Sequence, residues 1–195
     1  MKPVRRIEGR VAVLDRADVD TDQIIPKQFL KRIERTGYGE FVFFDWRKDP
    51  AFELNRPEYA GATILVAGRN FGCGSSREHA AWALQDYGFE AIVAPSFGDI
   101  FANNSAQIGL LTIPLPPEEV RELRDAHELT IDLEAQTIEA PGGPSIGFRI
   151  DPFVRHRLLN GLDDIGLTLE HEDEIGTYEA GHAARVDTLA LSQGT

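Results

Sequence analysis

Two serines and an arginine follow a glycine-rich turn in residues 70–79, NFGCGSSREH. Ser75 and Ser76 offer hydroxyl groups, and Arg77 offers a planar guanidinium suited to a carboxylate or a phosphate. The spacing of Ser75 and Glu78 fits a capping box at the start of a helix, where free backbone amides favour an anion. The segment therefore predicts an anion-binding site that carries two hydroxyl groups.

The same residues also allow a purely structural interpretation. Ser75 could serve only as a helix N-cap, Cys73 as a small turn residue and His79 as a packing residue. Known phosphate and nucleophile motifs do not fit, because no Gly-Lys-Ser/Thr follows the turn, Arg77 stands where G-x-G-x-x-G requires glycine, and no G-x-S-x-G frame is present. A hydrolase triad is disfavoured, since Ser75 and His79 have no evident acid to orient them.

The composition of the chain argues against several classes of binding partner and cofactor. The chain has 195 residues, a net charge of −12 and a sequence pI near 4.8. We expect no nucleic-acid partner, because such binding requires a basic surface. No apolar run approaches the roughly 20 residues of a membrane span, and none follows the first six residues as in a signal peptide, so we expect no membrane association and a cytoplasmic location. Cys73 is the one cysteine, which excludes an intrachain disulfide and a cysteine-built metal cluster in this chain.

Apolar runs around the turn predict the elements that position it. Residues 62–67, 75–87 and 91–94 have the pattern of a strand, a helix and a second strand. A further helix, opened by Pro95 and closed by Gly109, precedes a short buried strand. These segments predict a parallel sheet that presents the glycine turn at one edge.

In the segments before and after this unit, the apolar residues follow a strand-like pattern. Residues 5–14 form a strand-like run, and alternating residues predict a hairpin over 129–140 and a short strand over 147–150. A helix from Asp151 and an acidic helical stretch follow. The fold class is α/β, with a mixed parallel core, flanking antiparallel strands and a C-terminal helical extension. We expect a single domain over residues 1–182 and a flexible tail over 183–195.

Polar segments outside the turn leave alternatives open. Residues 20–22, Asp-Thr-Asp, suit a turn or a helix cap, or they place a carboxylate at the site. The basic loop 27–40 suits either a solvated face or a lid. The aromatic run 41–46 could be a strand or a buried helical turn. The pair Asn103-Asn104 is expected to face solvent.

Four segments, taken together and in order, resemble a known family. They are GSSREHAA at 74–81, DTDQIIP at 20–26, PSFGDIFANN at 95–104 with GLL at 109–111, and LDDIGLTL at 162–169. They resemble the swivelling domain of the aconitase superfamily, and within it the small-subunit family of the isopropylmalate dehydratases. The resemblance covers nearly the whole chain.

The resemblance implies a β/β/α swivelling-domain fold and a heterodimer. Its large subunit would hold a [4Fe–4S] cluster, so this chain itself would carry no cofactor and no metal. The implied activity is that of a hydro-lyase (lyase) in leucine biosynthesis, which converts 2-isopropylmalate to 3-isopropylmalate by dehydration and rehydration. Two alternatives stay open: the small subunit of a related hydro-lyase for homoaconitate, citraconate or dimethylmalate, and a non-catalytic anion-binding module.

The resemblance also implies roles for residues at the turn. Ser75 would be the catalytic general base that removes a carbon-bound proton. Ser76 and Arg77 would bind a carboxylate of the small dicarboxylate substrate, and Asp22, or Thr21 beside it, would reach the same site. The predicted helix amides and Arg77 would stabilise a serine alkoxide.

Substrate specificity is implied for the loop at about residues 27–37. Phe29, Leu30 and Ile33 could line an isopropyl group. Lys31 is one of several cations there that could meet a substrate carboxylate.

Overall fold

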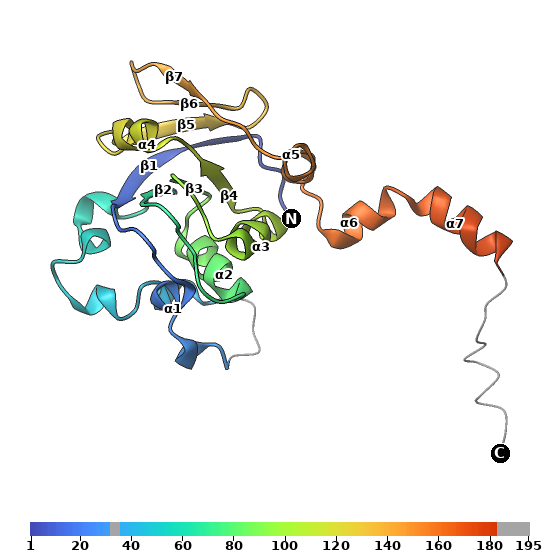
Figure 1. Ribbon diagram of the computed structural model, residues 1–195, viewed down its shortest axis with the longest axis horizontal. Helices are drawn as coiled ribbons and strands as arrows, with labels where there is room; N and C mark the ends of the chain where they lie inside the picture. The colour runs from blue at the N-terminus through green and yellow to red at the C-terminus, as the bar shows by residue number, and fades with distance from the viewer. Residues whose placement is uncertain (32–35, 183–195) are drawn as a thin grey trace. The chain divides into compact units, whose positions relative to one another are not determined.

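The computed structural model describes residues 1–31 and 36–182, and in them seven strands form one sheet in the order β4-β3-β2-β1-β5-β6-β7 (Figure 1). The strands are β1 (Arg6–Leu14), β2 (Ile64–Ala67), β3 (Ala91–Ala94), β4 (Leu111–Pro114), β5 (Glu128–Asp132), β6 (Thr137–Glu139) and β7 (Ser145–Gly147). The pairs β1–β2, β2–β3 and β3–β4 are parallel. The pairs β1–β5, β5–β6 and β6–β7 are antiparallel. The α/β class expected from the sequence is confirmed.

Strand β1 belongs to both halves of the sheet. Its first part, Arg6 to Arg10, pairs antiparallel with β5, and its last part, Val11 to Leu14, pairs parallel with β2. The sequence indicated antiparallel strands on either side of a parallel core. In the sheet, β5, β6 and β7 all lie on one side of β1, and the parallel strands β2, β3 and β4 lie on its other side.

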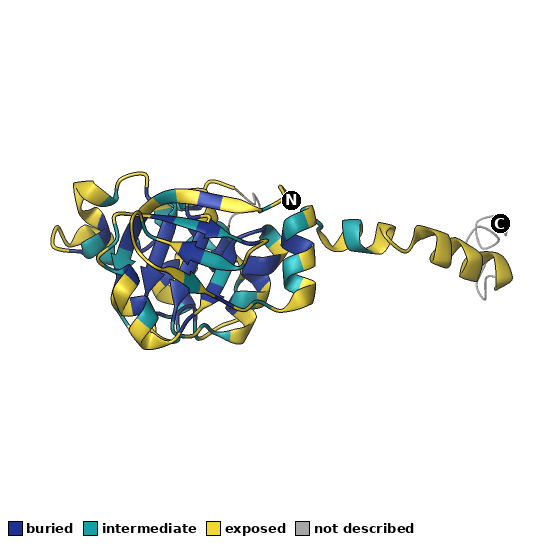
Figure 2. Cartoon of the chain, turned by 90° about the horizontal axis from the view of Figure 1, so that it is seen from above, coloured by how far each residue is buried: buried dark blue, intermediate teal, exposed yellow. Residues whose placement is uncertain are grey.

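Both faces of the parallel strands are covered, which explains their uninterrupted apolar sequences. Every residue of β2 and β3 is buried, and the sheet is largely dark blue in Figure 2. Leu65 and Ala67 belong to one hydrophobic cluster, with α2 (Glu78–Tyr87) and α3 (Asp99–Ile108). Ile64 and Val66 belong to the other, with α4 (Pro117–Leu123) and α5 (Pro152–Asn160). The alternation of side chains along a strand therefore builds two cores.

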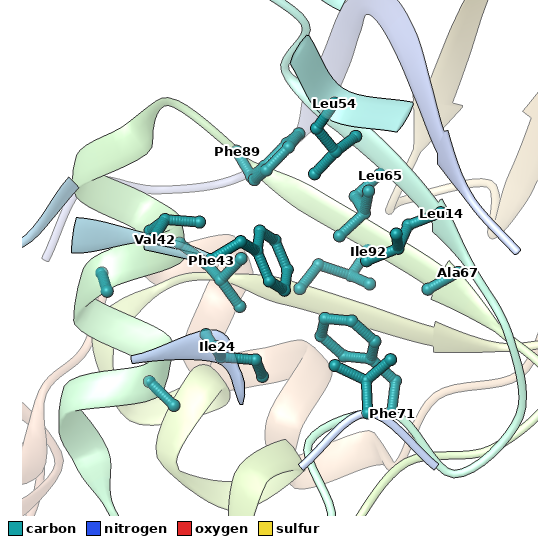
Figure 3. Close-up of a cluster of buried hydrophobic side chains, with 14 of the residues drawn as sticks. Leu14, Ile24, Val42, Phe43, Leu54, Leu65, Ala67, Phe71, Phe89 and Ile92 are labelled. Carbon is teal, nitrogen blue, oxygen red and sulfur yellow. The ribbon is translucent and has the colours of Figure 1, made fainter. Parts of the chain in front are cut away.

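The first cluster anchors the segments that carry the predicted site. Ile24, at the end of α1 (Thr21–Ile24), and Phe71, in the glycine turn, both reach into the apolar cluster around Leu65 and Ile92 (Figure 3). The two segments therefore rest on the same core, although about fifty residues separate them. The aromatic run 41–46 adds Phe43 to this cluster from a stretch with two 3-10 helices, Gly39–Phe41 and Trp46–Lys48, so it forms helical turns and no strand.

Two helix starts differ from the sequence prediction. The helix expected from residue 75 begins at Glu78, and the helix expected from Pro95 begins at Asp99. Extended backbone precedes each of them. Phe71 and Phe97 form a parallel bridge, and the amide of Gly98 donates to the carbonyl of Phe71 at 2.9 Å. Before α3, hydrogen bonds to the distant glycine turn therefore take the place of the first helical turn.

The contacts of the chain group into two units, Met1–Leu162 and Asp163–Thr195. The second unit contains α6 (Asp164–Leu169) and α7 (Glu172–Gly181). The boundary lies inside the single domain expected over 1–182, which stays a prediction, and the tail expected over 183–195 lies outside the described residues. Among the residues that the structure describes, no helix is long and apolar enough to cross a membrane.

Candidate functional site

The glycine turn and the start of α1 are joined by backbone hydrogen bonds. The amides of Gly72 and Cys73 donate to the carbonyl of Val19 at 2.8 and 3.2 Å, and the amide of Thr21 donates to the carbonyl of Cys73 at 2.9 Å. Asp20 and Cys73 thereby form a parallel bridge. This pairing joins residues 19–21 to residues 72–73. It thereby brings Thr21 and Asp22 close to the segment from Ser75 to Arg77.

Ser75 and Thr21 lie against each other at this junction. The Thr21 hydroxyl is 3.5 Å from the Ser75 hydroxyl and 3.3 Å from the Ser75 carbonyl oxygen. Thr21 is buried, whereas Ser75 and Ser76 are exposed. The structure thus presents the Ser75 hydroxyl to solvent with a second hydroxyl behind it.

The structure corrects the capping role considered for Ser75. The N-cap of α2 is Arg77, which makes no side-chain cap hydrogen bond, so the expected capping box between Ser75 and Glu78 is wrong. A capping box exists at α1 instead, where the Asp20 carboxylate accepts from the Gln23 amide and the Gln23 side chain accepts from the Asp20 amide. The turn-or-cap interpretation of Asp20 is therefore confirmed. Capping accounts for Asp20, but it no longer accounts for Ser75.

Arg77 forms an ion pair with Asp22. The arginine side chain is 23% exposed and the aspartate side chain is 53% exposed. The pair places a carboxylate beside a guanidinium that stands at the positive end of α2, where an uncompensated cation is unfavourable. The Arg77 guanidinium therefore already binds one carboxylate, that of Asp22.

Glycine is required at two positions of the turn. Gly72 and Gly74 have φ angles of +73° and +94°, in the left-handed region that other residues rarely adopt. A Cβ atom on Gly72 would also lie 2.2 Å from the Phe101 ring. A Cβ atom on Gly74 would lie 3.4 Å from the Asp20 side chain, so the turn approaches Phe101 at Gly72 and the start of α1 at Gly74.

The predicted specificity loop begins on an aromatic stack. The Phe29 ring lies 4.0 Å from Phe41 and 4.8 Å from Phe44, and Leu30 packs against the same cluster. Lys31 is exposed, and Ile33 lies outside the described residues.

The far end of this loop is attached to α2. The ring of buried Tyr38 lies 5.3 Å from that of His79, and the Tyr38 amide donates to an Asp86 carboxylate oxygen at 2.9 Å. Both His79 and Asp86 belong to α2, the helix whose N-cap is Arg77. The loop and the predicted anion site therefore share one supporting helix.

His79 and Cys73 have surroundings that suit packing. His79 also contacts Trp82 at 4.7 Å, and burial lowers its pKa, with Arg77 adding to the effect and Glu78 opposing it. Burial raises the pKa of the Cys73 thiol, as do Asp20 and Asp18, so the thiol stays protonated at neutral pH. The Cys73 thiol is therefore not activated as a nucleophile, and the His79 ring packs against Tyr38 and Trp82.

Arg69 is engaged beside the turn, and Asn104 differs from the solvent-facing position expected for it. Arg69, which flanks the turn, is paired with Asp18 at 3.1 Å, and Asp18 also accepts from the Asn70 amide group at 2.9 Å. Asn103 is exposed, but Asn104 is buried, and its Nδ2 atom has no hydrogen-bond partner. The helical spacing from Phe101 to Asn104 and Ile108 was the signal for that burial.

The described residues contain no cluster of three or more His, Cys, Asp or Glu side chains able to hold a metal ion. The chemistry that this part of the chain offers is thus one exposed serine with a second hydroxyl behind it, a guanidinium, and a carboxylate. These groups can hold an anionic substrate and exchange a proton with it.

Family models match three parts of the chain. The aconitase C-terminal domain matches residues 1–118, LeuD_N matches residues 122–152, and the C-terminal domain of the 3-isopropylmalate dehydratase small subunit matches residues 164–190. The first match contains the whole of the predicted site.

Similar proteins cover nearly all of the chain. The 3-isopropylmalate dehydratase small subunit of Rubrobacter xylanophilus is 58% identical over 185 residues, which covers 92% of this chain and 94% of the relative. That of Bacillus subtilis is 55% identical over 191 residues, covering 92% and 96%. A crystal structure of 3-isopropylmalate dehydratase (leuD) from Methanocaldococcus jannaschii has a TM-score of 0.69 at 28% identity and covers 89% of this chain and 99% of that one.

Proposed function

Because this chain belongs to the 3-isopropylmalate dehydratase small-subunit family, we propose that it forms one half of that hydro-lyase. The other half is a large subunit that carries a [4Fe–4S] cluster. Together they convert 2-isopropylmalate to 3-isopropylmalate by removing water and adding it back with the hydroxyl on the adjacent carbon. The proposed iron–sulfur partner implies a reducing compartment, the cytoplasm.

The convergence of two distant segments supports this proposal. At one exposed junction, Thr21 contacts Ser75 and Asp22 pairs with Arg77. A structural turn does not require an exposed serine there, and capping does not explain it. A site for a hydroxy-dicarboxylate requires a cation for the carboxylate and a group that takes up a proton, and both are present.

Ser75 is proposed as the general base. Serine is a weak base when free, so its alkoxide must be stabilised by its surroundings. Arg77 and the positive end of α2, which follow Ser75 by two and three residues, would contribute positive potential, and the Thr21 hydroxyl, 3.5 Å away, can donate to the oxygen. The alkoxide would take the proton from the carbon next to the hydroxyl-bearing one, and the serine hydroxyl so formed would return a proton to the carbon that has lost the hydroxyl.

Arg77 and Ser76 are proposed to hold a substrate carboxylate. The pairing with Asp22 indicates that a carboxylate can reach the guanidinium, and its planar fork has a second edge for another. Asp22 would keep the guanidinium in position while the substrate binds. The cluster, when bound in the large subunit, supplies a Lewis acid for the hydroxyl that leaves.

The residues of this chain fit a cluster held elsewhere. Its one cysteine has a raised pKa and packs in the turn, whereas an iron–sulfur cluster needs several cysteine thiolates. The hydroxyls of Ser75 and Ser76 are exposed, so a second protein can approach them and complete the site.

Reconstitution tests this function. The purified chain, combined with the large subunit under anaerobic conditions, should turn over 2-isopropylmalate and form the alkene that absorbs in the ultraviolet, with at least about tenfold preference over homocitrate. A preference for homocitrate would assign the pair to homoaconitate. Failure of the chain to associate with any cysteine-rich subunit would favour the anion-binding module instead.

Phe29 and Leu30 favour isopropylmalate over a tricarboxylate. Both are apolar side chains packed on the aromatic cluster at the start of the loop. An isopropyl group requires apolar lining, whereas an additional carboxylate requires a cation. Replacing Leu30 with Arg should lower the preference for isopropylmalate, and an unchanged ratio of the two kcat/KM values would remove Leu30 from the specificity loop.

A further inference from the structure

Residues 163–182, here termed the acidic arm, present large apolar side chains to solvent. Ile165 and Leu169 on α6 are 71% and 57% exposed, and Ile175 and Tyr178 on α7 are 38% and 64% exposed. Among the described residues, only Ile100 and Phe153 outside the arm are large hydrophobics exposed to a similar degree. The exposed apolar side chains are therefore concentrated in about a tenth of the chain.

The spacing of these side chains gives each helix one apolar face. Ile165 and Leu169 are four residues apart, and Ile175 and Tyr178 are three apart, so each pair lies on one side of its helix. The residues of α7 are exposed along its whole length (Figure 2). A helix this short is marginal in water by itself, and helices of this kind gain most of their stability by packing an apolar face against another surface.

The charge of the arm restricts what can cover it. Between residues 163 and 182 there are seven Asp or Glu residues and no Lys or Arg. Residues 1–162 carry 24 Asp or Glu against 19 Lys or Arg, a net charge of −5. A second copy of the arm carries the same seven acidic groups and no Lys or Arg, so two arms would repel each other. The complementary surface is apolar and lined with Lys or Arg.

The family matches separate the arm from the part of the chain that carries the site. Residues 1–118 match the aconitase C-terminal domain, whereas residues 164–190 match a C-terminal domain named for the small subunit. A swivelling domain that is a separate chain must be held to the rest of its enzyme by non-covalent contacts. We propose that the acidic arm docks into an apolar groove with basic edges on the large, iron–sulfur subunit.

This inference rests on the proposed function for the identity of the partner, but its test measures association. Leu169→Ser with Tyr178→Ser removes one apolar side chain from each helix. The full-length double variant should bind the purified large subunit with a dissociation constant at least about tenfold higher than that of the wild type, measured by titration calorimetry. At saturating concentration it should reach the wild-type kcat, because the arm contains none of the site residues.

The matched control removes apolar exposure elsewhere. Ile100→Ser with Phe153→Ser changes side chains that are 49% and 58% exposed in the body of the chain, and should alter the dissociation constant less than about twofold. Equal losses for both double variants would overturn the proposal, as would wild-type affinity of the arm variant. Self-association of the wild-type chain that the arm variant abolishes would assign the arm to a second copy and also overturn it.

Charge provides a second measurement. Asp173→Asn with Glu179→Gln should reduce the salt dependence of the association, since two of the seven acidic groups are neutralised. An unchanged salt dependence would show that no basic groove meets the arm. If the wild-type pair binds tightly but does not act on isopropylmalate, the proposed function fails while the docking inference stands.

Discussion

The hydroxyl of Thr21 lies 3.5 Å from the hydroxyl of Ser75, although 54 positions separate the two residues. The approach is fixed by hydrogen bonds that join the carbonyls of Val19 and Cys73 to the opposite segment. Neither segment could place its side chains alone. The site therefore forms only when the end of β1 and the end of β2 are both in the sheet.

Replacing Ser75 with Ala should abolish turnover while the chain still assembles. General-base catalysis contributes about 10²–10⁴-fold, so we expect kcat to fall roughly a thousandfold with KM changed little. Steady-state kinetics of the reconstituted enzyme measure both constants. Ser145→Ala, an exposed serine on β7, is the control and should retain wild-type kcat. A Ser75→Ala enzyme with a tenth or more of the wild-type rate would leave the proton transfer to another group.

Arg77→Lys should weaken substrate binding. A lysine ammonium cannot bind Asp22 and a substrate carboxylate through one planar fork, and a charge-assisted hydrogen bond contributes about 1.5–3 kcal/mol, so KM should rise roughly ten- to a hundredfold. The KM for 2-isopropylmalate is the measurement. Arg69→Lys is the control, because Arg69 is engaged with Asp18, and it should leave KM within about twofold. An unchanged KM in Arg77→Lys would exclude Arg77 from the substrate contact.

Gly72→Ala should destabilise the folded chain by about 3 kcal/mol or more. The residue has φ of +73°, and an added Cβ would lie 2.2 Å from the Phe101 ring, so backbone strain and overpacking act together. Urea unfolding followed by circular dichroism gives the free energy of unfolding. Gly147→Ala, whose Cβ would meet no heavy atom within 4 Å, should change it by less than about 1 kcal/mol. Similar values for the two variants would mean that the turn can shift without cost.

Glu53→Gln should lower stability at neutral pH and have less effect in acid. Desolvation raises the pKa of Glu53, but the hydrogen bonds from Arg16 Nε and Nη2, at 3.1 and 2.8 Å, and the nearby charges outweigh it, so the folded-state pKa lies below 4.5. A depressed carboxyl pKa stabilises the fold above the unfolded pKa, and this stabilisation is lost as the pH falls through the folded pKa.

The expected difference between Glu53→Gln and the wild type is about 1 kcal/mol at pH 7, since the pair is partly exposed. Thermal or urea unfolding at pH 7 and at pH 3 should show that the difference shrinks in acid. Glu134→Gln, which breaks the more exposed pair with Arg5, should change stability little at either pH. A difference that stays constant with pH would mean that the charge of Glu53 is not the cause.

Much of the fold follows from local pattern. The short apolar runs at β2 and β3 and the helical spacing between them predicted the parallel unit, because strands buried on both faces need continuous apolar sequence. The helix predicted to end at residue 87 does end there, and Gly88 follows it in the left-handed conformation common at helix ends. These features depend on residues near one another in the chain.

The errors arise where distant contacts outweigh local preference. Ser75 and Glu78 have the spacing of a capping box, yet the positive φ of Gly74 and the bonds to α1 keep the chain extended up to Arg77. Asn104 is a different case, because its helical spacing from buried Phe101 already indicated the buried face of α3. The ion pair between Asp22 and Arg77 could not be inferred from either segment by itself.

The division of β1 between two partners also determines where the chain tolerates insertions. Residues before Val11 are in register with β5 and those after it with β2, so one added residue inside β1 would break one of the two registers. It would also move Thr21 and Asp22 by one position relative to the glycine turn. The tip of the hairpin between β5 and β6 lies beyond the last paired residues, Asp132 and Thr137, so an insertion there shifts neither register of β1. A tag or a loop inserted at residues 134–136 should leave the two halves of the sheet, and the junction they support, in place.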